Sequence, residues 1–311
     1  MVNAIDVCSL TKQYRFVLAV DHINFEVNEG EIFGFLGPNG AGKTTTIRIL
    51  TGLTKPSGGC VKIFGHDIVK ETIAAKRHMG IVQEDSNVYN DLSAWDNMNF
   101  AGELYHVERH RREKVAKDLL GTMGLERIHE RVKGFSKGMK RRLTIAMAMI
   151  NDPRLLFLDE PTAGLDVQSA LLIRKIVRER NASGTTIFLT THNIEEANVL
   201  CDRVAIINKG RIAAIDRPAN LKRTIQSSQS IEVTFDRIEG VDMRRLAEIP
   251  SVNNASKEGD RYRLYTHDPA IVLEGIWGYA KEHKLRIITM NTMGPSLEDV
   301  FLRLTGGESI A

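Results

Sequence analysis

The residues with the clearest chemistry lie near the N-terminus, in the stretch 37–45, which reads GPNGAGKTT. Four of them fill the pattern G-x-x-x-x-G-K-[ST]: Gly37, Gly42, Lys43 and Thr44. Glycine lets the backbone N–H groups wrap a phosphate chain, because side chains would block that approach and some positions need a positive φ. The lysine places a charge at the β- and γ-phosphates, and the threonine hydroxyl suits Mg²⁺. The stretch therefore predicts a bound nucleoside triphosphate.

The segments on either side of this loop fit that prediction. Residues 31–36 (EIFGFL) read as a short apolar strand, and residues 45–50 (TTIRIL) read as the start of a helix. The positive end of the helix dipole then points at the phosphates. The loop does not say what the nucleotide is used for, since kinases, GTPases and motor ATPases share it.

Two carboxylates follow a second apolar run. Residues 155–158 (LLFL) have the character of a strand buried in a parallel sheet, and Asp159 and Glu160 come directly after them. Ligands of α/β folds bind at the carboxyl ends of the strands. Because successive strand residues point to opposite sides, Asp159 can hold Mg²⁺ while Glu160 takes a proton from water. An ordinary acidic strand end is the alternative, and the phosphate loop in the same chain weakens it.

Three single residues stand at positions where a ligand could be reached. His192 and Gln83 each follow an apolar strand, although a histidine or glutamine there is more often a hydrogen-bonded loop residue. Tyr14 lies upstream of the loop and could stack on a base. Tyr14, or Phe16, could instead pack under the sheet, and the spacing leaves both interpretations open.

A second helix N-terminus carries a hydroxyl group. Residues 135–139 (FSKGM) read as a glycine-containing turn that opens a helix at 140–150 (KRRLTIAMAMI), with Ser136 near its start. Backbone N–H groups at such an end can bind an anion. The sequence therefore holds a second potential anion site.

Apolar strands alternate with helical segments up to about residue 216, which predicts a mostly parallel α/β sheet. Residues 3–8 and 23–27 alternate apolar and polar side chains and read as two strands at a sheet edge. From residue 91 to about 150 the pattern is helical, with Ser93 as the expected N-cap. The basic run at 109–114 is most simply a solvated helix face.

The pattern changes after Arg217. Pro218 begins a break, and residues 222–230 are polar and linker-like. The next elements follow the order β-α-β-β-α-β, which predicts a small ferredoxin-like domain, and a final helix at 295–304 starts with proline. The expected elements are strands 231–236, 252–257, 261–266 and 285–290 and helices 242–248 and 269–283.

Length and composition set broad limits. The 311 residues suffice for two domains, and a net charge of +3 with a pI near 8.7 is far from a nucleic-acid-binding composition. The N-terminus has no signal-peptide pattern, and no apolar run approaches the ~20 residues that span a bilayer. The three cysteines are scattered, so neither a disulfide framework nor a metal site is indicated, and a reducing cytoplasm fits.

With these residues in order, residues 1–220 resemble the nucleotide-binding subunit of an ATP-binding cassette (ABC) transporter. The matching motifs are GPNGAGKTT with the Walker A loop, LLFLDEP (155–161) with Walker B and its catalytic glutamate, AGLD (163–166) with the D-loop, Gln83 with the Q-loop, His192 with the switch histidine and Tyr14 with the adenine-stacking aromatic. FSKGM is similar to the family signature LSGGQ, although Lys137 replaces a glycine and Met139 replaces the glutamine.

The resemblance implies a P-loop NTPase fold with a RecA-like core, an antiparallel β subdomain and a helical subdomain at about 87–150, followed by an accessory or dimerisation domain at 225–311. It also implies that two subunits pack head to tail around ATP and Mg²⁺. The implied ATP contacts are Tyr14, Gly37, Pro38, Asn39, Gly40, Ala41, Gly42, Lys43, Thr44, Thr45, Gln83, Ser136, Gly138 and Asp166. The implied Mg²⁺ ligands are Thr44, Gln83 and Asp159, and the implied catalytic residues are Lys43, Glu160 and His192.

The tail LEDVFLRLTG (297–306) resembles the daunorubicin-resistance-type subfamily, which also holds sodium, copper-linked and lipo-oligosaccharide exporters. This implies an exporter ATPase, cytoplasmic and peripheral on the inner face of the membrane, that drives a separate transmembrane permease and binds no nucleic acid. A soluble non-transport ABC ATPase is the alternative, but such proteins usually carry two cassettes or long coiled coils. A catalytically dead regulator is disfavoured by intact Lys43, Asp159, Glu160 and His192. The substrate is not readable. The tail domain could brace the dimer, regulate it or sense a ligand, and a brace or a regulator is the favoured interpretation.

Overall fold

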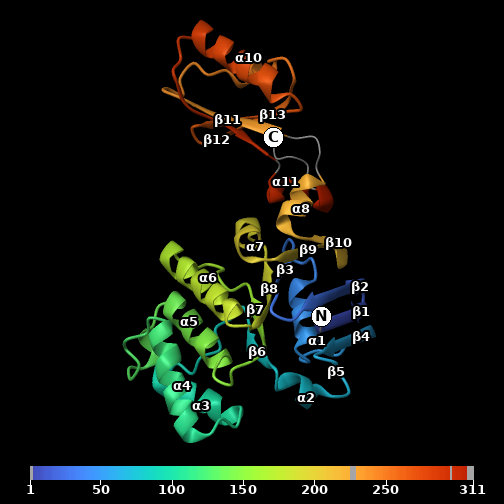
Figure 1. Cartoon of the computed structure of the whole chain (residues 1–311), viewed down its shortest axis with the longest axis vertical. Helices are drawn as coiled ribbons and strands as arrows, with labels where there is room; N and C mark the ends of the chain where they lie inside the picture. Colours follow the sequence, from blue (N-terminus) through green and yellow to red (C-terminus); the bar gives the residue numbers. More distant parts are fainter. Residues whose placement is uncertain (1–2, 225–228, 295, 307–311) are drawn as a thin grey trace. The chain divides into compact units, whose positions relative to one another are not determined.

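The computed structural model describes residues 3–224, 229–294 and 296–306 (Figure 1). The chain folds as two compact units, Met1–Arg217 and Pro218–Ala311. Each unit has its own hydrophobic core.

The centre of the first unit is a six-stranded sheet with the order β10-β9-β3-β8-β7-β6. All neighbours in it are parallel except the pair β9 and β10. Every residue of β3, β7 and β8 is buried, which is why residues 32–36 and 155–158 read as continuous apolar runs. The predicted parallel α/β core is therefore confirmed. The strands are β3 (Ile32–Leu36), β6 (Met79–Val82), β7 (Leu155–Asp159), β8 (Thr186–Thr191), β9 (Arg203–Asn208) and β10 (Arg211–Asp216).

A separate antiparallel sheet, with the order β2-β1-β4-β5, packs against this core. The prediction placed short strands at a sheet edge, and their lengths were wrong: β1 and β2 have 12 residues each. Irregularities in their register let the pairing continue through polar residues. Phe25 of β2 stacks on Phe33 and Phe188 of the central sheet, at 5.6 and 6.1 Å between ring centroids. The strands are β1 (Asn3–Tyr14), β2 (Val17–Asn28), β4 (Gly58–Ile63) and β5 (His66–Asp67).

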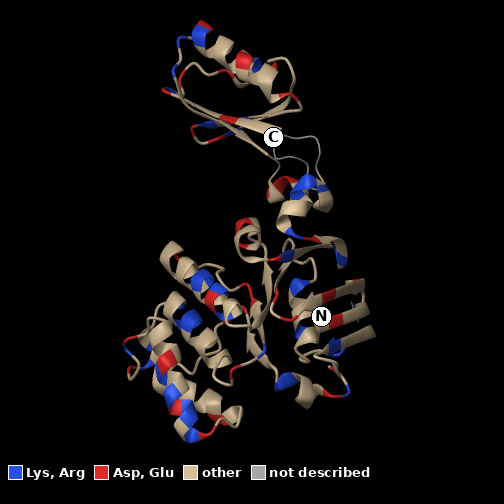
Figure 2. Cartoon of the chain, in the orientation of Figure 1, with Lys and Arg blue, Asp and Glu red and all other residues tan. Residues whose placement is uncertain are grey.

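Three helices form the helical subdomain: α3 (Ala94–Leu104), α4 (Arg109–Thr122) and α5 (Lys137–Ala148). Ser93 caps α3 as predicted, in a capping box with Asp96. Basic and acidic residues are interspersed along α4 (Figure 2), which fits the predicted solvated face. Among its described residues, this unit also contains the helices α1 (Lys43–Leu50), α2 (Thr72–Lys76), α6 (Val167–Ala182) and α7 (Ile194–Leu200) and the 3₁₀ turn Val132–Gly134.

The predicted turn at 135–139 was wrong in part, because α5 already begins at Lys137. Ser136 is its N-cap, and the Ser136 hydroxyl oxygen accepts a hydrogen bond from the Met139 N–H at 3.2 Å. This cap starts the helix three residues earlier than the apolar pattern suggested.

The second unit contains a four-stranded antiparallel sheet with the order β12-β13-β11-β14. Together with the element order β-α-β-β-α-β this is the ferredoxin-like arrangement, as predicted. Its elements are α8 (Pro218–Arg223), β11 (Gln229–Phe235), α9 (Met243–Ala247), β12 (Val252–Glu258), β13 (Arg261–Thr266), α10 (Pro269–Glu282), β14 (Ile287–Met293) and α11 (Leu297–Thr305).

Two predicted boundaries in this unit need correction. Pro218 opens the short helix α8 rather than a break, since proline suits the first turn of a helix. Part of the predicted linker, residues 225–228, lies outside the described residues, and so does Pro295. The last helix begins at Leu297, where Ser296 and Asp299 form a capping box.

Within the described ranges, no helix has both the length and the apolar character needed to cross a bilayer.

The separate cores predict that the first unit folds alone. A fragment ending at Arg217 should unfold cooperatively in thermal denaturation and should keep the nucleotide affinity of the full chain within about threefold. Circular dichroism and titration with a fluorescent nucleotide measure both properties. Loss of nucleotide binding from a folded fragment would place the domain boundary elsewhere.

Candidate nucleotide-binding site

Two glycines of the loop between β3 and α1, Gly37 and Gly42, leave no room for a side chain. A Cβ atom on Gly37 would lie 2.5 Å from the carbonyl oxygen of Ile207, and one on Gly42 would lie 2.5 Å from that of Ala19. Gly42 also has a φ of 110°, which other residues rarely adopt. Gly42 is the N-cap of α1 and offers no side-chain hydrogen bond, so the first N–H groups of this helix remain available to an anion.

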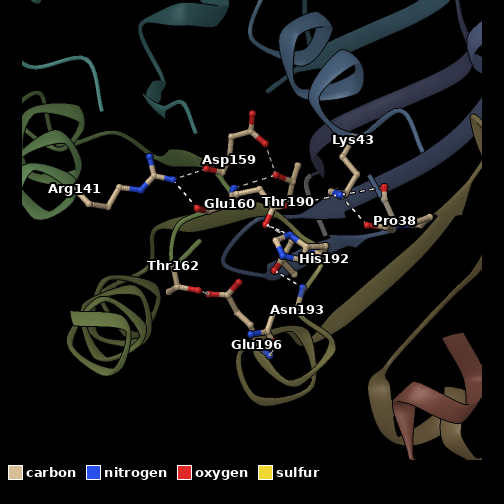
Figure 3. A network of polar contacts seen from close by, with 12 residues as sticks. Pro38, Lys43, Arg141, Asp159, Glu160, Thr162, Thr190, His192, Asn193 and Glu196 are labelled. Carbon is tan, nitrogen blue, oxygen red and sulfur yellow. Dashed lines mark hydrogen bonds and ion pairs between the residues drawn. The ribbon is translucent and has the colours of Figure 1, made fainter. Parts of the chain in front are cut away.

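The Lys43 ammonium lies between the loop and the acidic end of β7 (Figure 3). Its Nζ donates hydrogen bonds to the carbonyl oxygens of Gly37 at 2.7 Å and Pro38 at 3.3 Å. It also forms an ion pair with Glu160 Oε1 at 3.3 Å. The side chains of both charged residues are nearly buried, with 6% and 7% of their surfaces exposed. The charge of Lys43 is therefore aimed at the inside of the site.

Glu160 has a left-handed backbone, with a φ of 47°. Its N–H donates to the carbonyl oxygen of Thr190 at 3.1 Å and to the Thr190 hydroxyl at 3.2 Å. Its Oε2 accepts hydrogen bonds from His192, from Nδ1 at 2.8 Å and from the backbone N–H at 3.3 Å. The carboxylate is thus held between Lys43 and His192, as Figure 3 shows.

Asp159 faces a different environment. Its Oδ1 accepts a hydrogen bond from the Thr190 hydroxyl. Burial raises the pKa of Asp159 above its ordinary value, and this effect outweighs the hydrogen bond from Thr190, which lowers it. The neighbouring carboxylates of Glu84 and Glu160 raise the pKa further, while the Arg141 cation lowers it. A divalent cation beside Asp159 would therefore stabilise the ionised carboxylate.

The three residues expected to bind Mg²⁺ line one pocket of about 80 Å³: Thr44, Gln83 and Asp159. Glu84 and Asp85 line it as well. A hydroxyl, an amide oxygen and carboxylates are the hard oxygen ligands that Mg²⁺ prefers. In the part of the chain that the structure describes, no three His, Cys, Asp or Glu side chains form a metal cluster. The donor set therefore fits a cation that takes its remaining ligands from phosphate and water.

Other expected site residues lie away from this pocket. Ser136 caps α5, and Gly138 packs so closely on α6 that a Cβ atom would lie 2.3 Å from Ser169 Oγ. Asp166 caps α6, because its Oδ1 accepts a hydrogen bond from the Ser169 N–H at 2.9 Å. Within one chain, these residues do not line the pocket with Thr44 and Asp159.

Tyr14 stands at the end of β1 with 44% of its surface exposed, and the Lys12 ammonium lies 4.9 Å from its ring centroid. Phe16, at the hairpin tip, is 98% exposed. The alternative that either ring packs under the sheet was therefore wrong.

Sequence reasoning missed a buried polar network behind the site. Arg141 of α5 is 3% exposed and donates to backbone carbonyls at the ends of β6 and β7. The sequence does contain an indication of this role. Arg141 shares the buried face of α5 with Gly138, Ile145 and Ala148, and an apolar residue is expected at such a position. Thr162 also donates to the buried carboxylate of Glu196 at 2.7 Å.

Known proteins resemble this chain along most of its length. Residues 20–163 match the model of the family described as ABC transporter. The linearmycin resistance ATP-binding protein LnrL of Bacillus subtilis is 34% identical over 302 residues, which cover 96% of this chain and 97% of that protein. The Nod factor export ATP-binding protein I of Rhizobium meliloti is 39% identical over 308 residues, which cover 98% of this chain and 89% of that protein.

Solved structures match the first part of the fold. The ATP-binding subunit of an ABC transporter superimposes with a TM-score of 0.66 and 29% identity, over 71% of this chain and 93% of that one. A dimeric ATP-binding cassette in a post-hydrolysis state, bound to ADP and phosphate, superimposes with a TM-score of 0.62 and 26% identity, over 68% of this chain and 98% of that one.

The raised pKa of Asp159 predicts a pH-dependent effect on stability. The folded-state pKa of Asp159 exceeds its unfolded value. The contribution of Asp159 to the free energy of unfolding is therefore stabilising at low pH and is lost as the pH rises through the folded-state pKa. In the chain without metal or nucleotide, Asp159→Asn should therefore raise the melting temperature near neutral pH. The gain should shrink on acidification toward a pH of about 4.

Asp166 is the matched control, since hydrogen bonds from Ser169 lower its pKa. Its ionised form stabilises the fold above the unfolded pKa, so Asp166→Asn should lower the melting temperature near neutral pH. Thermal unfolding of both variants over a pH series measures whether each substitution raises or lowers the melting temperature. A melting temperature of Asp159→Asn below that of the parent near neutral pH would contradict the prediction.

Proposed function

Because this chain belongs to the family of ABC transporter ATPase subunits, whose members bind and hydrolyse ATP, we propose that it powers export through a separate transmembrane permease. One observation carries the mechanism: the Glu160 carboxylate is fixed between Lys43 and His192, next to the pocket of Thr44, Gln83 and Asp159. The export role rests on relatives that match nearly the whole chain and are named as Nod factor export and linearmycin resistance proteins.

The loop 37–45 holds the triphosphate of ATP. The backbone N–H groups before and at the start of α1 donate to the phosphate oxygens, and Lys43 turns its ammonium from the loop carbonyls to the β- and γ-phosphates. Thr44, Asp159 and Gln83 hold Mg²⁺, with Gln83 acting directly or through a water. The bound cation neutralises charge on the phosphates. Tyr14, exposed at the end of β1, stacks on the adenine.

Glu160 acts as the general base. It orients a water and takes its proton as the water oxygen forms a bond to the γ-phosphorus and the bond to the ADP oxygen breaks. His192 is hydrogen-bonded to Glu160 through Nδ1. Its other ring nitrogen, Nε2, contacts the γ-phosphate. Thr190 holds the Glu160 N–H and so keeps the carboxylate in place.

The second half of the site comes from another copy of the chain. Ser136 and Gly138 do not line the pocket of their own chain, whereas the N-terminus of α5 offers N–H donors to an anion. Two copies packed head to tail would place this end of one copy against the ATP bound to the other, with Asp166 at their contact. ATP closes this dimer and hydrolysis reopens it.

The permease docks beside Gln83. A groove of about 280 Å³ between Gln83 and the helical subdomain is lined mainly by apolar side chains, including Tyr89, Phe100, Leu104 and Met147. Leu104 is 65% exposed there, which suits a partner surface. Docking holds the subunit at the cytoplasmic face of the membrane. The relatives that support an export role are named for linearmycin resistance and Nod factor export.

Glu160→Gln tests the catalytic assignment. The amide cannot take a proton, so ATP turnover should fall by about 10²–10⁴-fold while ATP binding is kept, and the closed dimer should accumulate. Steady-state ATPase rates and gel filtration with ATP and Mg²⁺ measure these effects. The control is Glu179→Gln, on the exposed face of α6, which should behave like the parent. Turnover near the parent level in Glu160→Gln would overturn the assignment.

Leu104→Glu tests the docking groove. A carboxylate placed in the groove should abolish co-purification with the membrane partner, because burying an unpaired charge at an interface is unfavourable. The ATPase rate of the isolated subunit should stay within about twofold of the parent, since surface substitutions rarely disturb distant sites. The control is Ile73→Glu, on the exposed face of α2 (76% exposed) and outside this groove, which should keep the partner. Normal co-purification of Leu104→Glu would rule out this surface.

A further inference from the structure

The Arg141 guanidinium makes an unusual set of contacts for a buried charge. It is 3% exposed, and within the described residues its hydrogen bonds all go to backbone carbonyl oxygens. The acceptors are Gln83, Glu84 at 3.0 Å, Asp159 at 2.5 Å, Glu160 at 2.7 Å and Pro161 at 3.1 Å. Figure 3 shows the guanidinium turned toward the carbonyls of β7.

These acceptors come from two segments that are far apart in the sequence. Gln83 and Glu84 follow β6, and the other three carbonyls belong to the end of β7 and the turn after it. Arg141 itself lies one turn into α5, the helix that begins with the motif 135–139. A planar guanidinium has five N–H donors in a fixed geometry and can serve all of these carbonyls, whereas a lysine ammonium has only three donors. One side chain therefore joins three parts of the site.

The contact with Glu160 has a specific mechanical consequence. A left-handed backbone is unfavourable for a glutamate, and it persists only where the surroundings fix it. Thr190 binds the N–H of Glu160, and Arg141 binds its carbonyl oxygen. Both peptide groups around this residue are therefore held by hydrogen bonds, and its carboxylate stays directed at Lys43 and His192.

We propose that Arg141 is a positioning residue for ATP hydrolysis, which fixes the Glu160 backbone and the Gln83 segment to helix α5. The proposal rests on the proposed role of Glu160 as general base. It adds a coupling between the docking groove and the catalytic base. The Arg141 guanidinium binds the carbonyl oxygens of both Gln83, which lines the groove, and Glu160, so a movement of Gln83 is transmitted to Glu160. Arg141 acts through the backbone carbonyls that it binds.

The test compares Arg141→Lys with Arg142→Lys in the full chain. Arg142 is the matched control, because it lies on the same helix and also donates to carbonyl oxygens, those of Met123 at 2.6 Å, Gly124 at 3.3 Å and Gly138 at 3.4 Å. Those acceptors belong to the helical subdomain, and none of them belongs to the Glu160 or Gln83 segment. The readouts are kcat and KM for ATP, the melting temperature, and amide hydrogen exchange in segments 83–86 and 159–163.

Arg141→Lys should lower kcat by about 10- to 100-fold, since small displacements of a catalytic group have effects of this size. The KM for ATP should stay within about threefold, because the loop 37–45 is not among the contacts of Arg141. Exchange should become faster in both segments. Arg142→Lys should leave kcat and both segments unchanged within about twofold, with faster exchange only near residues 123–124.

The proposal is overturned if Arg141→Lys keeps its kcat, or if both variants lose kcat and melting temperature to the same extent. Arg141→Gln is measured alongside, because a neutral amide leaves no buried charge and should show the same loss of kcat in a folded chain. Glu160→Gln in the same assay separates two failures. An inactive Glu160→Gln with an unaffected Arg141→Lys refutes only the role of Arg141, whereas normal rates in both refute Glu160 as the base.

Discussion

The buried ion pair between Lys43 and Glu160 is the interaction on which the site depends. Removing two charges from water costs several kcal/mol for each ion, and their attraction offsets this only when further polar contacts satisfy both groups. Here Gly37 and Pro38 accept from the ammonium, and His192 donates to the carboxylate. The loop after β3 and the end of β7 are not adjacent in the sheet, since β8 lies between them. The pair therefore joins two segments across a strand, and β8 supplies the groups that support it.

Much of this arrangement could be predicted because it depends on local patterns. A glycine-rich loop, a buried apolar strand and a cap residue each follow from neighbouring residues, so the parallel core and the cap at Ser93 were predicted correctly. The lengths of β1 and β2 were not, because bulges carry the pairing through polar residues. Arg141 was missed for another reason. Its partners are backbone carbonyls, which every residue has, so no side-chain pattern marks them.

Packing explains how the 135–139 segment differs from the family signature. Gly138 faces Ser169 so closely that an added Cβ atom would lie 2.3 Å from the Ser169 Oγ, so a larger residue would require Ser169 to move. At position 137 a lysine is accommodated, because its side chain extends over Gly164, where a Cβ atom would lie 2.4 Å from Lys137 Nζ. A cation at the first turn of a helix is unfavourable next to the helix dipole. A phosphate bound at this end would reverse the sign of that effect.

The two helix ends differ in how their N–H groups are satisfied, and this difference bears on reversible closure. No side chain caps α1, so its first N–H groups gain fully from a bound phosphate. In α5 the Ser136 hydroxyl oxygen already accepts a hydrogen bond from the Met139 N–H. A bound anion would therefore add less hydrogen-bond stabilisation at α5 than at α1. In the proposed head-to-tail dimer, ATP would bind firmly at α1 of one copy and more weakly at α5 of the other. Loss of the γ-phosphate would then open the dimer at the α5 side first, while ADP stays on the loop 37–45.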